Sequence, residues 1–421
     1  MKKNRDLSRW QTKQVFSGLF DKFVQKSELS NGIYTFEYGD ENLDILLSKK
    51  DSKDLCVFFN GAIDKSKVIP PVFSGVGITK DLSVNLLCIN DPAVYRPNVG
   101  IGWYAGLDSV ALQQELLLII RKFVSALGIK KIIFVGGSGG GFAALYFSSF
   151  FDNSFALVWN PQTNFLNYNT KFVSIYLKEC LGISYDPAMS EKQLLTFIPE
   201  YVCYDLRYRY ILPNLSNFVI YLQNNSDWHV KSHMQPFIRC LADDIEIDYG
   251  KSKYCGLVKD GFYLCLDDFG VGHAVPPKDN LEKLLRLVLK PFGEGEPALS
   301  SLLDKEFNAN FFSNQNKKLI PEVFVDLFFG SKKIGAVITT DQSFFERNIE
   351  FAFYLFKDSV RKEVKWYTNN PRVLFDSTLE QGIWNVLGFV RNKFGDLKTA
   401  YSSKINIIVG DEEGLLINIV E

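Results

Sequence analysis

Histidine is scarce in this sequence, and several features that would indicate a function are missing. The 421 residues contain three His and three Met, and 47 Lys and Arg balance 48 Asp and Glu. This near-neutral charge gives no positive field for a nucleic-acid backbone. No stretch reaches the roughly 18 apolar residues of a spanning helix, and residues 1–20 lack the apolar core of a secretory signal. We therefore expect a cytoplasmic protein with no membrane span and no nucleic-acid partner.

Cysteine is present but follows no metal-binding or disulfide pattern. The chain has seven Cys, an odd number, and no two of them form a C-x-x-C pair. Segments such as LCVFF and LLCIN place them among apolar residues. Reduced thiols that pack as small apolar side chains explain this distribution better than disulfides or zinc.

Short apolar runs alternate with helical segments through the first two thirds of the chain. The runs are DLCVFFNGA, VNLLCIND, KKIIFVGG, SFALVWNPQT, NFVIYLQNNSD and DGFYLCLDDFG. In SVALQQELLLIIRKFVSALG, apolar residues recur at steps of three and four, as in an amphipathic helix. Continuous apolar strands that alternate with helices predict an α/β fold, a mostly parallel sheet with helices on both faces.

Changes in composition and in the pattern of apolar residues divide the chain into regions. Residues 1–51 are expected to form a helical lead-in and a β-hairpin, and residues 52–293 the α/β unit. The segment KPFGEGEPALSS has the Gly, Pro and Ser of a boundary, so residues 294–319 are a predicted linker. Residues 320–421 contain short alternating runs between turn residues. Such runs are typical of a small antiparallel, immunoglobulin-like β-sandwich.

One serine stands among glycines directly after the third apolar run. The residues around Ser138 read GGSGG and satisfy G-x-S-x-G, between a predicted strand and a predicted helix, as that motif requires. Side chains two positions either side of the serine would collide with the neighbouring strand and helix. The helix that follows offers free backbone N–H groups to a developing oxyanion. Ser138 is therefore a candidate nucleophile at the carboxyl edge of the sheet.

Two other interpretations of this glycine turn compete with a nucleophile. Gly139, Gly141 and Ala144 loosely match a dinucleotide-binding fingerprint, but the next strand ends on Trp159 and Asn160 instead of an acidic residue. A purely structural turn is the second alternative, because G-x-S-x-G also occurs by chance. The decision depends on whether a base and an acid accompany the serine.

All three histidines follow the serine in the sequence. His273 lies in the loop DDFGVGHAVPP, which leaves the last core strand, and Asp227 follows the strand before it. The order Ser138, Asp227, His273 is that of a hydrolase triad in which the histidine is the base and the aspartate orients it. Asp267 and Asp268 are alternative acids, unless they only cap the last strand.

His229 and His233 stand four residues apart, a spacing at which one helix face could offer two imidazoles to a metal. No H-E-x-x-H glutamate accompanies them, and Asp227 is the only other ligand nearby. We expect no metal, and we treat His229 as a candidate substrate contact.

The second oxyanion donor is expected in the loop VFFNGAID. Asn60 and Gly61 would turn the chain so that the N–H of Ala62 faces the serine, together with the N–H of Gly139. An ordinary Asn-Gly turn without a catalytic role is an equal alternative.

The chain resembles the α/β-hydrolase superfamily over roughly residues 52–293, on the GGSGGG turn and the order of the three candidate catalytic residues. FFNGA, GGSGGGFAALYFS and NPQT further resemble segments of bacterial proteins associated with capsule and other surface polysaccharides, some of which are sugar O-acetyltransferases. This resemblance implies an acyl-serine enzyme that acts on a saccharide. Many common esterases have a histidine at the position of Asn60. Because of this difference, the assignment of the oxyanion loop stays open.

The preferred function is acetyl transfer to a bacterial surface or capsular polysaccharide, with acetyl-CoA as a possible donor and no bound cofactor. Alternatives are an esterase or deacetylase, and a non-catalytic accessory protein of polysaccharide or secretion assembly. Aromatic and polar residues at strand ends are of the kinds that bind sugars: Asn60, Trp103, Tyr104, Asn160 and Gln162. The C-terminal aromatics belong either to a sandwich core or to a sugar-binding face: Trp366, Tyr367 and Trp384.

Overall fold

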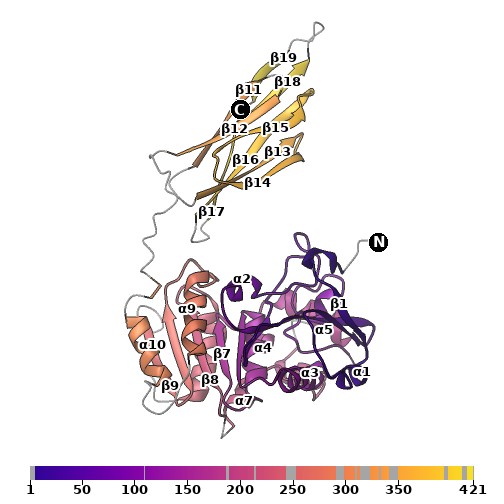
Figure 1. The fold of residues 1–421 in the computed structure, drawn as a ribbon, viewed down its shortest axis with the longest axis vertical. Coiled ribbons are helices and arrows are strands. Elements are labelled where there is room, and N and C mark those ends of the chain that lie inside the picture. Colours follow the sequence, from indigo (N-terminus) through magenta and orange to yellow (C-terminus); the bar gives the residue numbers. More distant parts are fainter. Residues whose placement is uncertain are drawn as a thin grey trace. The chain divides into compact units, whose positions relative to one another are not determined.

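The chain forms two compact units, Met1–Asn314 and Gln315–Glu421. The structure is a computed structural model and describes residues 5–108, 110–185, 189–212, 215–242, 253–290, 298–308, 311–312, 323–330, 333–340, 349–392, 397–409 and 415–420. Figure 1 shows both units, the first with helices around a sheet and the second made of strands. None of the helices in these ranges is long and apolar enough to cross a membrane.

A ten-stranded sheet runs through the first unit. In sheet order its strands are β1 (Gln14–Gly18), β2 (Gly32–Tyr38), β3 (Glu41–Ser48), β5 (Asn85–Ile89), β4 (Asp54–Phe59), β6 (Lys131–Gly137), β7 (Phe155–Trp159), β8 (Phe218–Asn224), β10 (Phe262–Asp267) and β9 (Tyr254–Lys259). The neighbours from β5 to β10 in this order pair in parallel, whereas β9 and β3 add antiparallel strands at the two sides. The predicted parallel sheet is confirmed, and all six apolar runs are strands.

The N-terminal lead-in differs from the expected helix. Apart from a 3-10 turn, it contains the strand β1 and a single five-residue helix, α1 (Phe20–Val24). β1 pairs in parallel with β2, so Val15 and Phe16 extend the sheet. β-branched and aromatic residues favour this extended pairing over a helix.

The strands bury apolar side chains on both faces, as a parallel sheet should. Along β4, Leu55, Val57 and Phe59 join one core cluster, and the alternating Cys56 and Phe58 join another. Helices with residues in the first cluster are α1, α3 (Leu112–Leu127), α4 (Gly139–Ser148), α5 (Thr170–Leu181), α6 (Glu191–Leu195), α7 (Arg207–Tyr210) and α8 (Gln235–Leu241). Helices packed on the second are α2 (Val76–Thr79), α9 (Lys278–Leu289) and α10 (Leu299–Asn308).

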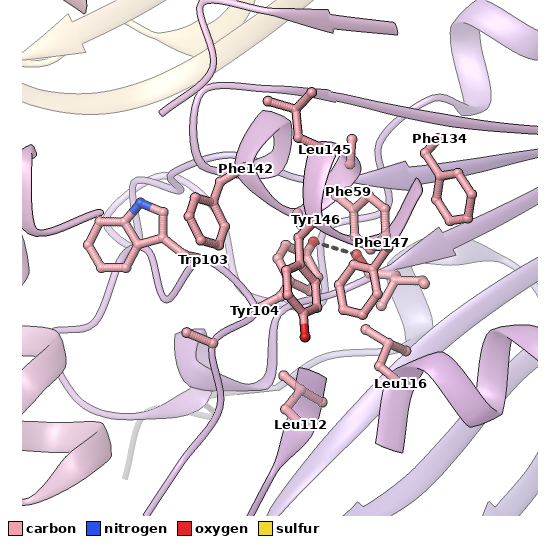
Figure 2. Close-up of a cluster of buried hydrophobic side chains, with 14 of the residues drawn as sticks. Phe59, Trp103, Tyr104, Leu112, Leu116, Phe134, Phe142, Leu145, Tyr146 and Phe147 are labelled. Carbon is pink, nitrogen blue, oxygen red and sulfur yellow. Dashed lines mark hydrogen bonds between the residues drawn. The ribbon is translucent and has the colours of Figure 1, made fainter. Parts of the chain in front are cut away.

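An aromatic group anchors the strand ends on the first face. Figure 2 shows the rings of Phe59, Tyr104, Tyr146 and Phe147 packed together, with Trp103 near Phe142. The rings of Phe59 and Phe147 are nearly parallel, and their centroids are 5.3 Å apart. This packing fixes α4 against β4, and both elements lead into the candidate site.

Strand order reverses at the centre of the sheet. The chain moves from β4 to β5 on one side and returns to β6 on the other, so β4 lies between them. Such a switch point leaves a crevice beyond the carboxyl ends of the two strands whose connections diverge. Asn60 follows β4 and Ser138 follows β6, so the two predicted loops meet there.

The range expected as a linker contains a helix of the first unit. Leu299, Leu303 and Phe307 of α10 are buried in the second core cluster. The Tyr263 hydroxyl donates to Asp304 at 2.7 Å, which adds a polar contact between α10 and β10. The Gly/Pro-rich segment before α10 has the composition of a boundary, although the chain continues into core beyond it.

The second unit is an antiparallel β-sandwich, as predicted. One sheet has the order β11 (Val323–Gly330), β12 (Lys333–Thr340), β15 (Arg372–Thr378), and the other β14 (Val360–Thr368), β13 (Ile349–Lys357), β16 (Gly382–Asn392), β18 (Lys404–Val409), β19 (Leu415–Val420), with β17 (Leu397–Tyr401) beside β16. Trp384 is buried in the core between the sheets, whereas Trp366 is 69% exposed and Tyr367 packs under the Arg391 guanidinium. The three aromatics therefore divide between core and surface.

The expectation that every cysteine is an unpaired thiol is wrong for two of the seven. Cys255 on β9 and Cys265 on β10 form a disulfide. The antiparallel register places these two residues directly opposite each other, which sequence spacing alone does not reveal. The other five are free thiols, and Cys56 and Cys88 are fully buried as expected.

Candidate active site

Ser138 occupies a strained turn between β6 and α4. Its backbone has φ 55° and ψ −122°, in the positive-φ range that residues other than glycine rarely adopt. The strain holds because the Ser138 N–H donates to Trp159 O at 3.0 Å and its carbonyl accepts from the N–H of Gln162 at 3.2 Å. Strained serines between a strand and a helix expose their hydroxyl at the sheet edge.

The flanking glycines are required by close contacts. A Cβ on Gly137 would lie 2.0 Å from the indole nitrogen of Trp159, and one on Gly140 would lie 2.5 Å from the carbonyl oxygen of Phe59. The first approach lets β7 pack beside the turn. The second brings the N-terminus of α4 against the end of β4, so the turn and the oxyanion loop form one rigid corner.

Asp227 and His273, the predicted acid and base, are in direct contact. His273 Nδ1 lies 2.6 Å from Asp227 Oδ2, and the second carboxylate oxygen accepts from the N–H of His229 at 3.0 Å. The Asp227 side chain is fully buried, whereas the His273 side chain is 39% exposed. Because Asp227 can only accept, Nδ1 carries the proton, and the Nε2 lone pair is free to act as a base.

Side chains before Asp227 hold the histidine loop. The Asn224 amide donates to the carbonyls of Gly270 and Gly272, and the Ser226 hydroxyl donates to Gly270 at 3.0 Å. The amide of Asn160, which follows β7, donates to Ala274 O at 2.6 Å. The segments that follow β7 and β8 thus hold the loop of His273, and Asn160 binds the residue after the histidine.

The Ser138 hydroxyl is bound to Gln162. Gln162 Nε2 donates to Ser138 Oγ at 3.1 Å, and among the described residues no hydrogen bond joins Ser138 to His273. The Trp103 indole N–H donates to Gln162 Oε1. Since an indole can only donate, this contact fixes the orientation of the amide and turns its NH₂ group toward the serine.

The expected oxyanion loop lies beside the serine. A Cβ on Gly61 would be 3.6 Å from Ser138 Cβ, so the backbone of this loop approaches the nucleophile closely. Gly139 is the first residue of α4, and its N–H has no partner within the helix. The Tyr104 hydroxyl accepts from the Asn60 N–H at 2.8 Å and holds the start of the loop. Donation by Ala62 and Gly139 to an oxyanion stays a prediction.

The six predicted substrate contacts lie around this centre but are buried. Their exposed fractions are at most 5%, for Asn60, Trp103, Tyr104, Asn160, Gln162 and His229. Their hydrogen bonds go to the turn, the oxyanion loop and the histidine loop. The structure therefore places them where they position the site, and direct contact with a ligand stays a prediction.

The three histidine rings pack in a row that runs from His273, beside Asp227, through His229 to His233. The ring centroids of His229 and His273 are 4.5 Å apart, and those of His229 and His233 are 4.6 Å apart. His229 Nδ1 donates to Asn160 O at 2.9 Å, so its unpartnered Nε2 lacks a proton when the ring is neutral. Burial lowers the pKa of His229 to about 4 and that of His233 well below its usual range.

Asp227, His229 and His273 could together hold a metal ion, since their ligand atoms lie within 4.8 Å of one another. The grouping differs from the pair of His229 and His233 that their spacing suggested, for which no metal was expected. Each ring already uses one nitrogen, His273 toward Asp227 and His229 toward Asn160. These contacts are explained without a metal if Asp227 and His273 act as acid and base and the adjacent His229 is neutral.

The sequence analysis did not predict two aromatic residues that lie near the site. Tyr168 and Trp228 stack at 5.6 Å with an angle of 27°, and Trp228 is 48% exposed. Tyr168 also contacts the ring of His229 at 5.9 Å. The only sequence signal was the position of Trp228 directly after the predicted acid. They form an open aromatic surface beside Asp227.

Comparison with known proteins finds similar solved structures only. No protein-family model matches the sequence, and no curated protein matches it. The capsule O-acetyltransferase of Neisseria meningitidis serogroup A is 14% identical, with 64% of this chain and 99% of that chain covered and a TM-score of 0.43. The Pyrococcus horikoshii acylaminoacyl peptidase is 14% identical, with 68% and 45% covered and a TM-score of 0.41. An alpha-beta serine hydrolase homologue from Coxiella burnetii is 10% identical, with 62% and 99% covered and a TM-score of 0.33.

The fold and the site define the class of the first unit. Its parallel sheet carries the strained serine after β6, the acid after β8 and the histidine after β10, at one edge. This is an α/β-hydrolase-like unit, and the predicted resemblance in fold is confirmed.

Proposed function

We propose that the chain is a serine acyl enzyme that transfers an acetyl group to a saccharide hydroxyl. The observation that carries the proposal is the 2.6 Å contact of buried Asp227 with His273, at the same sheet edge as the strained Ser138. Aspartate, histidine and serine in this arrangement generate a nucleophile from a hydroxyl that is otherwise unreactive at neutral pH.

The first half reaction forms an acyl-serine. His273 Nε2 takes the proton of Ser138 Oγ while Oγ attacks the donor carbonyl, and the N–H groups of Gly139 and Ala62 stabilise the oxyanion. The carbon–sulfur or carbon–oxygen bond of the donor then breaks, and the leaving group takes the proton from His273. In the resting structure the Gln162 amide donates to Ser138 Oγ and leaves the serine proton available, so the hydrogen bond from the hydroxyl to His273 has to form before the transfer.

The second half reaction releases the acyl group. An acceptor hydroxyl gives its proton to His273 and attacks the acyl carbonyl, and Ser138 Oγ recovers a proton from His273. The surface of Trp228 and Tyr168 supports a saccharide acceptor, because flat rings stack on sugar faces and Trp228 is exposed beside Asp227. Acetyl-CoA is the proposed donor, and a mutant of the Neisseria capsule enzyme was determined in complex with CoA.

Ester hydrolysis is the second candidate. The 39% exposure of the His273 side chain favours it, because water can reach the base that would activate it for attack on the acyl-serine. A non-catalytic accessory role is the remaining alternative. It predicts that loss of the Ser138 hydroxyl leaves the biological activity unchanged.

Serine-dependent labelling tests the proposal. Wild-type protein should react with a fluorophosphonate probe and, after incubation with acetyl-CoA, gain the mass of one acetyl group, and Ser138→Ala should do neither. Release of the acetyl group to a saccharide but not to water would favour transfer over hydrolysis. Absence of labelling with every acyl donor would overturn the proposed function.

The acid can be tested with a matched pair of variants. Asp227→Asn should lower kcat on p-nitrophenyl acetate by a factor on the order of 10⁴, because the neutral side chain no longer fixes the histidine tautomer. Asp267→Asn is the control, since Asp267 pairs with Lys253 at 2.8 Å instead of with a histidine. Equal losses in the two variants would contradict the assignment of Asp227.

A further inference from the structure

A large cleft opens beside the oxyanion loop. Its volume is about 1100 Å³, and residues of three segments line it: Ala62, Ile63, Val68, Ile69 and Pro70 from the loop after β4, Pro97, Asn98 and Gly100 from the loop after β5, and Phe172 from α5. None of the residues predicted as substrate contacts lines it. The cleft is far larger than an acetyl group needs, and its volume slightly exceeds the roughly 300–1,000 Å³ of pockets that hold whole ligands.

Ala62 links the cleft to the reaction centre along the chain, because it lines the cleft and follows the residue that approaches Ser138. Ala62 follows Gly61, whose backbone approaches Ser138 closely, and the Ile63 N–H donates to Gly100 O at 2.8 Å, which closes one wall. The predicted oxyanion donor Ala62 thus stands between the cleft and the serine. The ring of Phe172 contacts Tyr168 at 5.7 Å, so the cleft and the surface of Tyr168 and Trp228 are adjacent.

The cleft wall favours a long, mostly apolar molecule. Seven of the twelve lining residues are apolar, five of them isoleucine, valine or proline, and Phe172 is the one aromatic ring among them. Stacked saccharides need flat rings, which the Trp228 surface offers and this cleft does not. The cleft wall thus fits a flexible chain better than a sugar.

Positive charge surrounds the mouth of the cleft. Lys65 lines it, with Nζ donating to Arg96 O at 2.6 Å, and partial burial lowers the pKa of Lys65. Lys67 is next in sequence to lining residues, and the Arg9 guanidinium donates to the carbonyl of Ile69 at 3.0 Å. Asp64 is the one carboxylate in the lining and pairs with Lys67 at 3.1 Å. The remaining charge complements an anionic end group.

We infer that this cleft holds the leaving-group arm of the acyl donor, a pantetheine chain that ends in phosphate, as in acyl-CoA. The inference rests on the proposed function. Ser138 Oγ bonds to the thioester carbon, the carbon–sulfur bond breaks, and the thiol formed with the His273 proton stays in the cleft until it leaves. The acceptor approaches from the Trp228 side, so donor and acceptor bind on different sides of the serine.

Filling the cleft tests the inference. Val68→Trp places a large ring inside the cleft, and Val76→Trp places the same ring on an exposed residue of α2 outside the lining. Titration calorimetry of the full-length protein with CoA should show the dissociation constant raised at least about tenfold by Val68→Trp, a loss of about 1.4 kcal/mol, and unchanged in Val76→Trp. Pantetheine without phosphate should bind wild type more weakly than CoA.

A second measurement separates this inference from the proposed function. Ser138-dependent turnover of p-nitrophenyl acetate, which needs no long arm, should stay within about twofold in both tryptophan variants. Turnover without CoA binding by the wild type, or CoA binding unaffected by Val68→Trp, would overturn the cleft assignment and leave the serine enzyme intact. If Val68→Trp lost ester turnover to the same extent as CoA binding, the substitution would have damaged the reaction centre. That result would also overturn the cleft assignment. Absence of both binding and turnover in wild type would reject both proposals.

Discussion

The Ser138 hydroxyl is affected by two side chains, Gln162, which donates a hydrogen bond to it, and His273, its proposed base. The Gln162 amide can only donate to Oγ, so the serine proton remains available for an acceptor such as the lone pair of His273. The Trp103 N–H holds Oε1 of the same amide, and Trp103 itself has a φ of 54°, unusual for a bulky residue. Strain at Trp103 and Ser138 is stored where the chemistry is expected.

Gln162→Met should therefore impair the serine without weakening substrate binding. We expect kcat on p-nitrophenyl acetate to fall by about 10- to 100-fold with KM nearly unchanged, because the hydroxyl loses its fixed orientation. Trp103→Phe should produce a smaller loss, since the amide stays but can turn around. In the double variant the losses should not add, because both changes break one chain of hydrogen bonds. Additive losses would contradict this chain.

The buried histidines make stability depend on pH. Burial lowers the pKa of His229 to about 4 in the folded chain, against the ordinary 6.5, so the unfolded chain binds more protons between these values. Folding stability from this group is complete above pH 6.5 and is lost as the pH falls through 4. At about 1.4 kcal/mol per pKa unit, the effect is on the order of 3 kcal/mol.

His229→Asn removes this titration and keeps a donor for the carbonyl of Asn160. The midpoint of thermal unfolding should fall less between pH 7 and pH 4.5 in this variant than in wild type. His233, whose pKa is also lowered by burial, still titrates in both proteins and gives the remaining slope. Identical pH profiles for the two proteins would exclude His229 as a source of acid sensitivity.

At the scale of elements, patterns of neighbouring residues were sufficient for much of the fold. Six apolar runs became strands and GGSGG became the strand-to-helix turn, because continuous apolar runs and forced glycines are local consequences of a buried parallel sheet. The order of Ser138, Asp227 and His273 along the chain also predicted which strand ends carry them.

Other parts of the site depend on contacts between distant residues. The bond from Trp103 to Gln162 joins positions 59 residues apart, and both residues are fully or almost fully buried. The stacking of Tyr168 on Trp228 likewise brings two loops together. No periodicity or spacing encodes such contacts, and for the same reason the disulfide of Cys255 and Cys265 and the helix α10 were missed.

The corner between β4 and α4 can be tested with alanine. Gly140→Ala should destabilise the first unit by about 3 kcal/mol or more, because its Cβ would overlap Phe59 O and Asn60, which are backbone atoms of a buried strand end. Gly77→Ala in α2 is the control, since no atom lies within 4 Å of its added Cβ, and it should be neutral or stabilising by up to about 1 kcal/mol. Urea unfolding measures both. Equal stability of the two variants would contradict the tight corner.

For the whole molecule, the question is where the hydrolase-like unit ends. Contacts divide the chain after Asn314, and α10 lies before that point with Leu303 and Phe307 completely buried. Composition alone suggests an earlier end, in the Gly/Pro-rich segment from residue 291. The two positions differ by one helix, which covers β9 and β10 on the second face of the sheet.

Two truncated chains distinguish these boundaries. A chain that ends at residue 314 should keep the Ser138-dependent turnover of p-nitrophenyl acetate and unfold within a few degrees of the first unit of the full chain. A chain that ends at residue 296 lacks α10 and should be insoluble or unfolded, because burial of each large apolar side chain there is worth about 2–5 kcal/mol of a total of about 5–15. Thermal unfolding and ester turnover of both chains distinguish the two boundaries. If the chain ending at 314 were also unfolded or inactive, the sandwich would be required for the stability of the first unit. If the chain ending at 296 stayed folded and active, α10 would be dispensable.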